Sequence, residues 1–391
     1  MAEFHGPILS GLRIVEISAF IAAPLGGACL AALGADVIRI DPPGGGIDIA
    51  RWPLHEGRSL YWAGLNQGKR SVAIDFRTDT GRRQTTGIIT APGEGGGIFL
   101  TNLPSAKWSS FEELSKKRPD LIMVLITGSR DGRTAVDYTV NAELGFPYIT
   151  GPEGHVGPVN HVLPAWDAMT GFLAATAILA AERHRRLTGQ GQLVELSLAD
   201  VGLAVAGHLG FLAEAQLTKE PRGRYGNYVF GTFGRDFNTR DGHHVMVLAL
   251  TPRQWTALCE ATGLGERFAE IEARENADLS TEGDRWRCRH DLTSLLDGWI
   301  AERDLVQVAD VFEAAGVLWS PYRTFKEFIA SDAFLSTQKA FADEVDHPGL
   351  GRYWTLGSPI RFAANSAMPP RPAPELGQHT REVFEEFGLA E

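Results

Sequence analysis

The sequence lacks the motifs that mark the commonest cofactor and metal sites. The segment "SAFIAAPLGGACLAALG" carries no GxGxxG, so a nicotinamide dinucleotide site is disfavoured, although Asp41 ends the second expected strand where such a site places an acid. The glycine runs at 44–46 and 93–97 do not continue into GK[ST], and there is no GxSxG and no HExxH. We therefore expect neither a metal site nor a hydrolase nucleophile elbow.

Cysteine and positive charge are also scarce. Three widely spaced cysteines give no disulfide framework and no zinc site, which fits a reducing compartment. The net charge of −11 argues against general binding to nucleic acid or to an anionic membrane, so an anionic ligand would need a local basic pocket. The longest apolar run, Phe172 to Ala181, is too short for a bilayer, and no targeting segment is evident. We expect a cytoplasmic protein.

The first 130 residues contain strand-like and helix-like segments in alternation. "GLRIVEIS", "PLGGACLAALG" and "ADVIRID" read as a βαβ unit. They are followed by "RSVAIDF" at 70–76, a helical or loop stretch, "GIFLTN" at 97–102, and "LIMVLITG" at 121–128. This alternation predicts an α/β fold with a parallel sheet.

A second region begins near residue 220. Asp241-Gly242 lies between two strand-compatible runs and predicts a hairpin, and Thr251-Pro252 predicts the start of a helix. We expect a large domain from residues 1–220, a smaller α+β domain from 221–330, and a C-terminal part, 331–391, that returns to the large domain.

One carboxylate stands at the start of an apolar segment. Asp167 ends "NHVLPAWD" and precedes "AMTGFLAATAILAA". A helix N-terminus favours an ionised carboxylate, which makes Asp167 a candidate nucleophile. Asp is also a preferred N-cap residue, so on this pattern alone a structural cap is the better interpretation.

Several segments together resemble the family III CoA-transferases from about residue 8 to the C-terminus. They are "GLRIVEIS…AAPLGGACLAALGADVIRIDPPGGG", "SLYWAGLNQGKRSVAIDFRTDTGR", "TNLPSA", "LTGQGQLVELSLAD" and "PAPELGQHTREVFEEFG". The resemblance implies an acyl-CoA substrate, a Rossmann-like large domain plus a smaller one, and an interlocked homodimer. It implies no metal, nicotinamide or nucleotide cofactor.

The resemblance also implies that Asp167 is the catalytic residue. Its carboxylate would attack a thioester carbonyl to give a mixed anhydride, and CoA thiolate would then form an aspartyl-CoA thioester. The segments "RWPLHEGRSLYWAGLNQGKRS", "GSRDGRTAVDYTVN" and "VNHVLPAWDAMTG" are most like family members that move CoA between the C1 and C4 carboxyls of mesaconate.

The family's contact positions can be carried onto this sequence. The implied CoA-binding residues are Ile21, Ala22, Arg39, Ile74, Asp75, Phe76, Arg77, Asn102, Leu103 and Lys107. The implied substrate pocket contains Phe20, Asp137, Gly231 and Gly234. Taken singly, each cation is a plausible surface charge and each apolar residue plausible packing, and Asp137 is as good a turn or N-cap residue.

Two segments depart from the better-known family pattern. Ala19-Phe20-Ile21-Ala22 stands where formyl-CoA transferase has His-Val-Gln-Ala, and "FGTFGRDF" stands in place of a run of four glycines. Both changes make the expected pocket more apolar and less open to a second acid, which favours transfer within one molecule.

Other functions remain alternatives at this point. The same Asp167 would serve an intermolecular CoA-transferase that uses two different acids. A racemase needs a base for an α proton, and "TGSRDGRTAVDYTVN" lacks the family's histidine. In a non-catalytic CoA-ester binding protein, Asp167 would only cap its helix.

Overall fold

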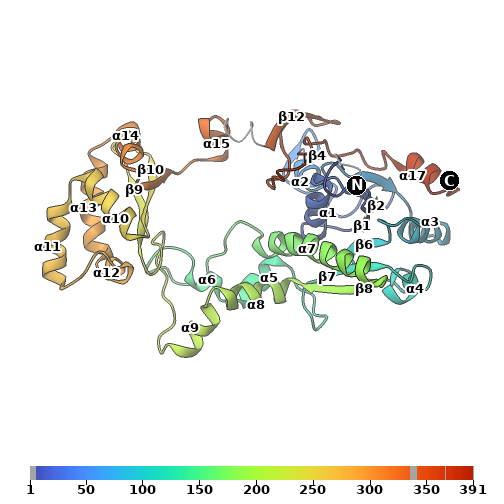
Figure 1. Ribbon diagram of the computed structural model, residues 1–391, viewed down its shortest axis with the longest axis horizontal. Helices are drawn as coiled ribbons and strands as arrows, with labels where there is room; N and C mark the ends of the chain where they lie inside the picture. The colour runs from blue at the N-terminus through green and yellow to red at the C-terminus, as the bar shows by residue number, and fades with distance from the viewer. Residues whose placement is uncertain (1–5, 335–340, 366, 391) are drawn as a thin grey trace. The chain divides into compact units, whose positions relative to one another are not determined.

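The computed structural model describes residues 6–334, 341–365 and 367–390, and the chain divides into two compact units (Figure 1). The first contains residues 1–144, 162–217 and 335–391, and the second contains residues 145–161 and 218–334. Both ends of the chain therefore belong to the first unit. Domain limits after residues 220 and 330 stay a prediction, and the grouping by contacts also places 145–161 in the second unit.

A six-stranded parallel sheet forms the centre of the first unit. Its order is β5-β2-β1-β6-β7-β8, and every neighbouring pair runs parallel. The strands are β1 (Arg13–Ile17), β2 (Asp36–Asp41), β5 (Arg70–Ala73), β6 (Ile98–Thr101), β7 (Ile122–Thr127) and β8 (Gln192–Ser197). The α/β fold with a parallel, Rossmann-like sheet is confirmed.

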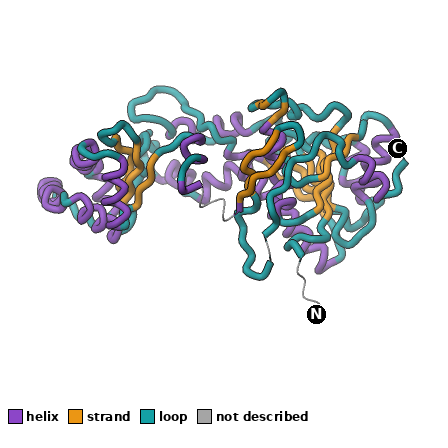
Figure 2. Tube along the Cα trace, turned by 90° about the horizontal axis from the view of Figure 1, so that it is seen from above, coloured by secondary structure: helices purple, strands orange, loops and turns teal. Residues whose placement is uncertain are grey.

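Helices cover both faces of this sheet, which explains why its strands read as nearly continuous apolar runs. Val15 and Ile17 pack in one cluster with Ile88 and Val383. Alternate residues such as Glu16 face the opposite side, because successive side chains of a strand point in opposite directions. In Figure 2 the strands of this unit lie between helical segments. The helices of the unit include α3 (Asp79–Thr90), α4 (Phe111–Ser115) and α17 (Thr380–Glu386), which are labelled in Figure 1.

Two helices on the second face, α1 (Ala22–Ala32) and α7 (Ala165–Thr188), pack closely together. A Cβ built on Gly26 would lie 3.0 Å from the carbonyl oxygen of Gly171, and one on Gly171 would lie 2.8 Å from that of Ala22. Larger side chains at these positions would push the helices apart. The small residues that open α7 therefore fix the distance between its first turn and the end of β1.

The strand order reverses direction between β1 and β6, where parallel α/β sheets usually bind ligands. Asn102, just after β6, holds the loop that follows β1. Its Oδ1 accepts a hydrogen bond from Ala19 N at 2.9 Å, and its Nδ2 donates to Ala19 O at 2.6 Å. The two loops are thus joined at the carboxyl end of the sheet.

The remaining elements of the first unit are short strands and helices around this core. The strands form two hairpins, β3 (Leu54–His55) with β4 (Arg58–Ser59), and β12 (Ala342–His347) with β13 (Gly351–Leu356). The helices are α2 (Leu60–Leu65), η1 (Lys107–Ser109), α5 (Asp137–Glu143), α8 (Leu198–His208) and α9 (Phe211–Leu217).

The second unit combines a three-stranded antiparallel sheet with helices. Its strands are β9 (Phe233–Asn238), β10 (His244–Ala249) and β11 (Leu318–Pro321), in the order β11-β10-β9. Its helices are α6 (Phe146–Ile149), α10 (Pro252–Thr262), α11 (Gly265–Glu275), α12 (Glu282–Arg287), α13 (Arg289–Ala301), α14 (Leu305–Ala315) and α15 (Phe325–Ile329). The expected hairpin at Asp241-Gly242 is confirmed, as is the helix start at Thr251, whose hydroxyl accepts from Gln254 N.

The sixth strand, β8, is one that sequence patterning did not predict. It follows α7 directly after Gly191, where a Cβ would lie 2.0 Å from the carbonyl oxygen of Leu121. Its residues alternate poorly between buried and exposed, because it is an edge strand.

Among the described residues no single helix is long and apolar enough to cross a membrane. The bent pair α8 and α9, which meet at 64°, passes that test only when the two are taken together.

A buried network of charged side chains lies beneath the end of β1. Lys69 Nζ donates to both carboxylate oxygens of Glu16 at 2.9 Å, to Pro24 O at 2.8 Å and to Asn66 Oδ1 at 3.0 Å. Arg39 donates to both oxygens of Asp41, at 2.8 and 2.9 Å. Glu16 and Arg39 are completely buried and Lys69 is 3% exposed, so each charge depends on its partners.

Replacing Lys69 with Met should destabilise the protein by about 3–5 kcal/mol, because Glu16 would remain as an unpaired buried charge. Urea unfolding followed by tryptophan fluorescence measures this loss. The double variant E16Q/K69M leaves no charge unpaired and should recover part of the stability. A double variant no more stable than K69M would show that lost packing, rather than the unpaired buried charge of Glu16, causes the effect.

Candidate functional site

Asp167 lies in the first turn of α7 but does not cap it. The helix begins at Ala165, its N-cap residue is Pro164, and no side-chain capping hydrogen bond comes from that residue. Asp167 is the third helical residue. The cap interpretation of Asp167 is therefore wrong, and its carboxylate is left available for another role.

The capping oxygen comes from Asp137, the first residue of α5. Asp137 Oδ2 accepts hydrogen bonds from Trp166 N at 2.7 Å and from Asp167 N at 3.1 Å. Two of the backbone donors that a helix leaves unpaired at its start are thereby satisfied. Asp137 is 2% exposed, and its other oxygen, Oδ1, is buried without a hydrogen-bond partner in the described structure. The expected proximity of Asp137 to Asp167 is thus seen, together with its capping function.

The pKa of Asp167 shows how these surroundings act on it. Burial raises the pKa of Asp167 to about 6, the nearby Asp137 carboxylate raises it further, and the Arg51 guanidinium lowers it. The helix N-terminus was expected to keep this group strongly ionised. Desolvation and like charge outweigh that effect. At neutral pH the carboxylate is still mostly ionised, and it is poorly solvated, which suits a nucleophile.

The loop after β1 brings Phe20 to the same end of the sheet. Phe20 has a φ of 62°, a conformation that non-glycine residues rarely adopt. Its N–H donates to Asp48 Oδ2 at 3.1 Å, and Asp48 in turn faces Arg39 at 3.4 Å. Strain of this kind persists only where the surrounding structure enforces it, and it gathers at functional sites. The buried network therefore holds Phe20 in place.

Arg51 and Tyr61 are site residues that sequence reasoning missed. The Arg51 guanidinium lies over the rings of Phe20 and Tyr61, 5.3 Å from each centroid. Burial raises the pKa of Tyr61 to about 12, with Arg51 opposing the rise and Asp167 and Asp48 adding to it. These mutual effects place Tyr61, Arg51 and Asp167 together. The Tyr61 hydroxyl is buried and has no hydrogen-bond partner among the described residues.

The expected CoA-binding residues near the switch point lie together. Ile21 and Ala22 form the start of α1, and Asn102 and Leu103 follow β6. Asn102 uses its amide to bind Ala19, as described above, so its part in a CoA site would be to shape the loop. Ile74, at the end of β5, is 3% exposed and belongs to the apolar core.

A second group of expected residues lies at the end of β5. Asp75 and Arg77 pair with each other on the surface at 2.7 Å, and Phe76 lies 6.4 Å from the Trp108 ring next to Lys107. A cavity of about 320 Å³ opens beside Trp108, and its lining includes the cations Arg82, Arg83 and Lys117. Asp79 and Glu113 also line this cavity, and Asp79 pairs with Arg82 at 3.3 Å. A charged cavity with an aromatic wall was not predicted at this place.

Arg39 requires a correction. It was expected to bind CoA, but it is completely buried, and its guanidinium is bound to Asp41 and to the Ser18 carbonyl oxygen at 3.1 Å. No nitrogen of Arg39 is free to reach a phosphate. Its role in this structure is to support the loop that carries Phe20.

The two glycines expected in the substrate pocket belong to the second unit. Gly231 has a φ of 83°, and a Cβ on Gly234 would meet Leu248 and Val229 at 3.1–3.2 Å. These contacts explain both glycines locally. Their place in a substrate pocket stays a prediction.

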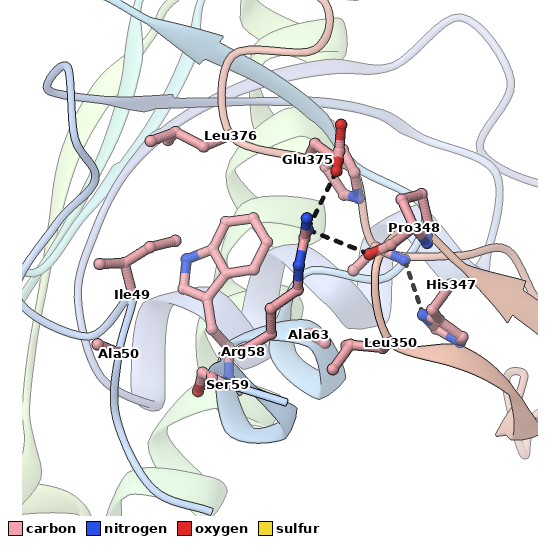
Figure 3. Close-up of a pocket in the computed structure, with 14 residues that line it drawn as sticks. Ile49, Ala50, Arg58, Ser59, Ala63, His347, Pro348, Leu350, Glu375 and Leu376 are labelled. Carbon is pink, nitrogen blue, oxygen red and sulfur yellow. Dashed lines mark hydrogen bonds and ion pairs between the residues drawn. The ribbon is translucent and has the colours of Figure 1, made fainter. Parts of the chain in front are cut away.

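Another cavity, of about 340 Å³, is lined by none of the expected site residues. Figure 3 shows Arg58 pointing toward Glu375 and the carbonyl oxygen of Pro348, with which it interacts at 3.0 and 3.3 Å. His347 and Leu350 form part of its wall. Its Arg58 is already paired, and the nucleophile candidate lies elsewhere.

Within residues 6–334, 341–365 and 367–390, no group of three or more His, Cys, Asp or Glu side chains is placed to hold a metal ion.

Comparison with known proteins gives a consistent result. Residues 9–380 match the model of CoA-transferase family III. The chain is 54% identical over 387 residues to a 2-methylfumaryl-CoA isomerase of Chloroflexus aurantiacus, covering 98% of this chain and 95% of that protein. It is 29% identical to a succinyl-CoA:mesaconate CoA-transferase of Haloarcula marismortui, covering 97% of this chain and 96% of that protein.

Solved structures show the same fold. A CaiB/BaiF family protein from Brucella suis superposes with a TM-score of 0.80 at 24% identity, covering 97% of this chain and 99% of that chain. The Rv3272 protein of Mycobacterium tuberculosis gives a TM-score of 0.77 at 22% identity, with the same coverage of both chains.

Replacing Asp167 with Asn should stabilise the protein by about 1–3 kcal/mol at pH 8. Between pH 3.8 and about 6 the unfolded chain ionises Asp167 while the folded chain keeps it protonated, so stability falls as pH rises through this window. Asn removes that loss. Denaturant unfolding should show that D167N has a larger free energy of unfolding than the native protein at pH 8 and a smaller advantage at pH 4. An equal advantage at both pH values would contradict the raised pKa of Asp167.

Replacing Asp137 with Asn should lower the pKa of Asp167, because the nearby negative charge is lost while an oxygen remains to accept from the two backbone donors. Carbon-13 NMR titration of the Asp167 carboxyl, assigned with D167N, measures this pKa. The variant D137A, which leaves both donors unpaired, should instead lose about 1–2 kcal/mol of stability. An unchanged titration in D137N would mean that burial alone sets the pKa.

Proposed function

Because the chain belongs to CoA-transferase family III, we propose that it moves CoA between the C1 and C4 carboxyls of mesaconate, converting 2-methylfumaryl-CoA to 3-methylfumaryl-CoA. The observation that carries this proposal is the half-buried Asp167 carboxylate, which is not used as a cap and faces one carboxylate and one cation. The likeness to the Chloroflexus isomerase along nearly the whole chain supports the choice of substrate.

The proposed reaction uses Asp167 as a covalent nucleophile. One Asp167 oxygen attacks the C1 thioester carbonyl, the C–S bond breaks, and CoA leaves as a thiolate with formation of a mixed anhydride. The thiolate then attacks the aspartyl carbonyl of the anhydride, which releases mesaconate and leaves an aspartyl-CoA thioester.

The second half of the reaction repeats these steps from the other end of the acid. Mesaconate turns, and its C4 carboxylate attacks the aspartyl thioester and expels the thiolate. The thiolate attacks the C4 carbonyl of the new anhydride and frees the Asp167 carboxylate. Each bond formed replaces one broken, and no proton, electron, metal or further cofactor enters the balance.

Neighbouring residues would assist these steps. Asp137 holds the first turn of α7 through two backbone donors, which fixes the direction of the Asp167 side chain. The buried Tyr61 hydroxyl has a donor to offer to an oxygen that gains negative charge during attack. Phe20 provides an apolar wall beside them.

The CoA moiety would lie over the carboxyl ends of the strands. Ile21, Ala22 and Leu103 flank the switch point, and Phe76, Arg77 and Lys107 lie toward the edge of the sheet. The cations of the adjoining cavity suit the phosphate groups at the nucleotide end, since an acidic protein must gather positive charge locally.

We also propose a cytoplasmic homodimer, interlocked as in the family. Six large apolar side chains on α7 to α9 and the turn between α8 and α9 are exposed by 37–64% in the single chain: Met169, Phe172, Leu173, Leu203, Leu209 and Leu212. An exposed apolar surface of this kind marks an interface.

Incubation of the protein with 2-methylfumaryl-CoA and isotope-labelled free mesaconate tests the function. We expect conversion to 3-methylfumaryl-CoA, a CoA adduct on Asp167 that hydroxylamine removes, and little label in the product. The variant D167N should show neither adduct nor turnover. Label entering the product at the rate of turnover would instead establish an intermolecular transferase. Full turnover by D167N would exclude the covalent mechanism.

A further inference from the structure

We propose that Arg51 binds the carboxylate of the substrate that is not reacting, and so selects dicarboxylic acyl-CoA esters and keeps the freed dicarboxylate in the site. This inference rests on the proposed function and adds to it the residue that recognises the second acid group. It concerns a residue that neither the sequence patterns nor the family positions above assign.

The first argument is the charge around Asp167. The charges that act most on Asp167 are the Asp137 carboxylate and the Arg51 guanidinium. A mesaconyl thioester brings a further negative charge at its free end. Asp137 and Asp167 both repel that charge, and Arg51 is the nearby group that can attract it.

The second argument is that Arg51 has its charge available. It makes no ion pair with any described residue, although this protein carries a net charge of −11. Its neighbour Arg58, on the following hairpin, pairs with Glu375 at 3.0 Å. Arg51 is also solvent-exposed, so a ligand can reach it. A guanidinium without a carboxylate partner is well suited to bind one in a bidentate manner.

The third argument is that aromatic rings and the backbone hold Arg51 in place. Its guanidinium N–H groups are not bound to carboxylates of the described residues. The rings of Phe20 and Tyr61 flank the guanidinium at 5.3 Å each, and cation–π contact restricts its movement. Its backbone is fixed by Arg51 N, which donates to Asp48 O at 3.1 Å, and by Arg51 O, which accepts from the Ser59 hydroxyl. The charge is therefore positioned before substrate arrives.

The symmetry of the reaction makes one such cation sufficient. In mesaconate the two carboxyl groups stand at opposite ends of a double bond. When C1 reacts with Asp167, the C4 carboxylate is free, and when C4 reacts the C1 carboxylate is free. A single guanidinium near Asp167 can hold whichever end is not reacting. Between the two halves it also keeps the free dicarboxylate from leaving.

The experiment compares two substrates in three variants. The rate at which the CoA adduct forms on Asp167 is measured by intact-protein mass with 2-methylfumaryl-CoA and with crotonyl-CoA, which lacks the second carboxylate. In R51Q the rate with 2-methylfumaryl-CoA should fall about 10²-fold, because a charge-assisted pair is lost, while the rate with crotonyl-CoA should stay within about threefold. R51K keeps the charge and should fall between R51Q and the native protein. R58Q, on the adjacent hairpin, should match the native protein on both substrates.

The retention part of the proposal has its own readout. With labelled free mesaconate present, R51Q should incorporate more label per turnover than the native protein, since released dicarboxylate escapes and exchanges. Unfolding midpoints of R51Q and R51K should equal that of the native protein.

Two outcomes would overturn the proposal. Equal losses on both substrates in R51Q would show a structural role for Arg51, and unchanged rates on both would show no role. A failure of the proposed function is distinguishable, because it would appear in the native protein as an absence of isomerisation and of the Asp167 adduct.

Discussion

The buried charges beneath the end of β1 are the constraint on which the site depends. Glu16, Lys69, Arg39 and Asp41 lie in the interior of an α/β sheet, where isolated charges are very unfavourable. Their mutual bonds make the arrangement possible and also make it specific, because each donor has a defined acceptor. The network ends in Asp48, which binds the backbone of Phe20. A loop of unfavourable conformation is thereby attached to the most rigid part of the molecule.

The opposite balance holds at Asp167, the proposed nucleophile. In the proposed mechanism it gains reactivity from the same burial and like charge that make its ionised form unfavourable. Asp137 has a stabilising and a destabilising effect. One of its oxygens accepts hydrogen bonds from two backbone N–H groups at the start of α7, and its negative charge disfavours the ionised form of Asp167. Active sites commonly keep such locally unfavourable groups, and the surrounding structure has to compensate for them. Here the close contact between α1 and α7 supplies that rigidity through Gly26 and Gly171.

The sequence predicted the sheet, which the structure confirms, and pointed to Asp167 as the candidate nucleophile, and it did so for different reasons. Strands such as "RIVEI" are apolar on both faces, a pattern that survives without tertiary information, whereas the edge strand β8 has no such pattern. Asp167 was singled out by its place before an apolar helix, and the family resemblance added the catalytic role. The cap interpretation was wrong because the capping oxygen comes from Asp137, thirty residues away. Arg39 was misassigned since a buried cation and a surface cation look alike in sequence. Arg51 was missed for the same reason, and only its ring contacts and lack of an ion pair distinguish it.

The proposed covalent cycle also changes the charge of the site in a way that favours retention. While Asp167 is ionised, a dicarboxylate would face two protein carboxylates and one guanidinium. When Asp167 carries CoA as a thioester its charge is gone, so one of the two carboxylates that repel the freed dianion is removed while Arg51 still attracts it. Repulsion is therefore lowest during the interval in which mesaconate must stay and turn. It returns when Asp167 is released at the end of the cycle, at the moment when the product ester has to leave. Formation of the aspartyl-CoA thioester thus activates the acyl group and also lowers the repulsion of the free acid during the step in which that acid must stay bound.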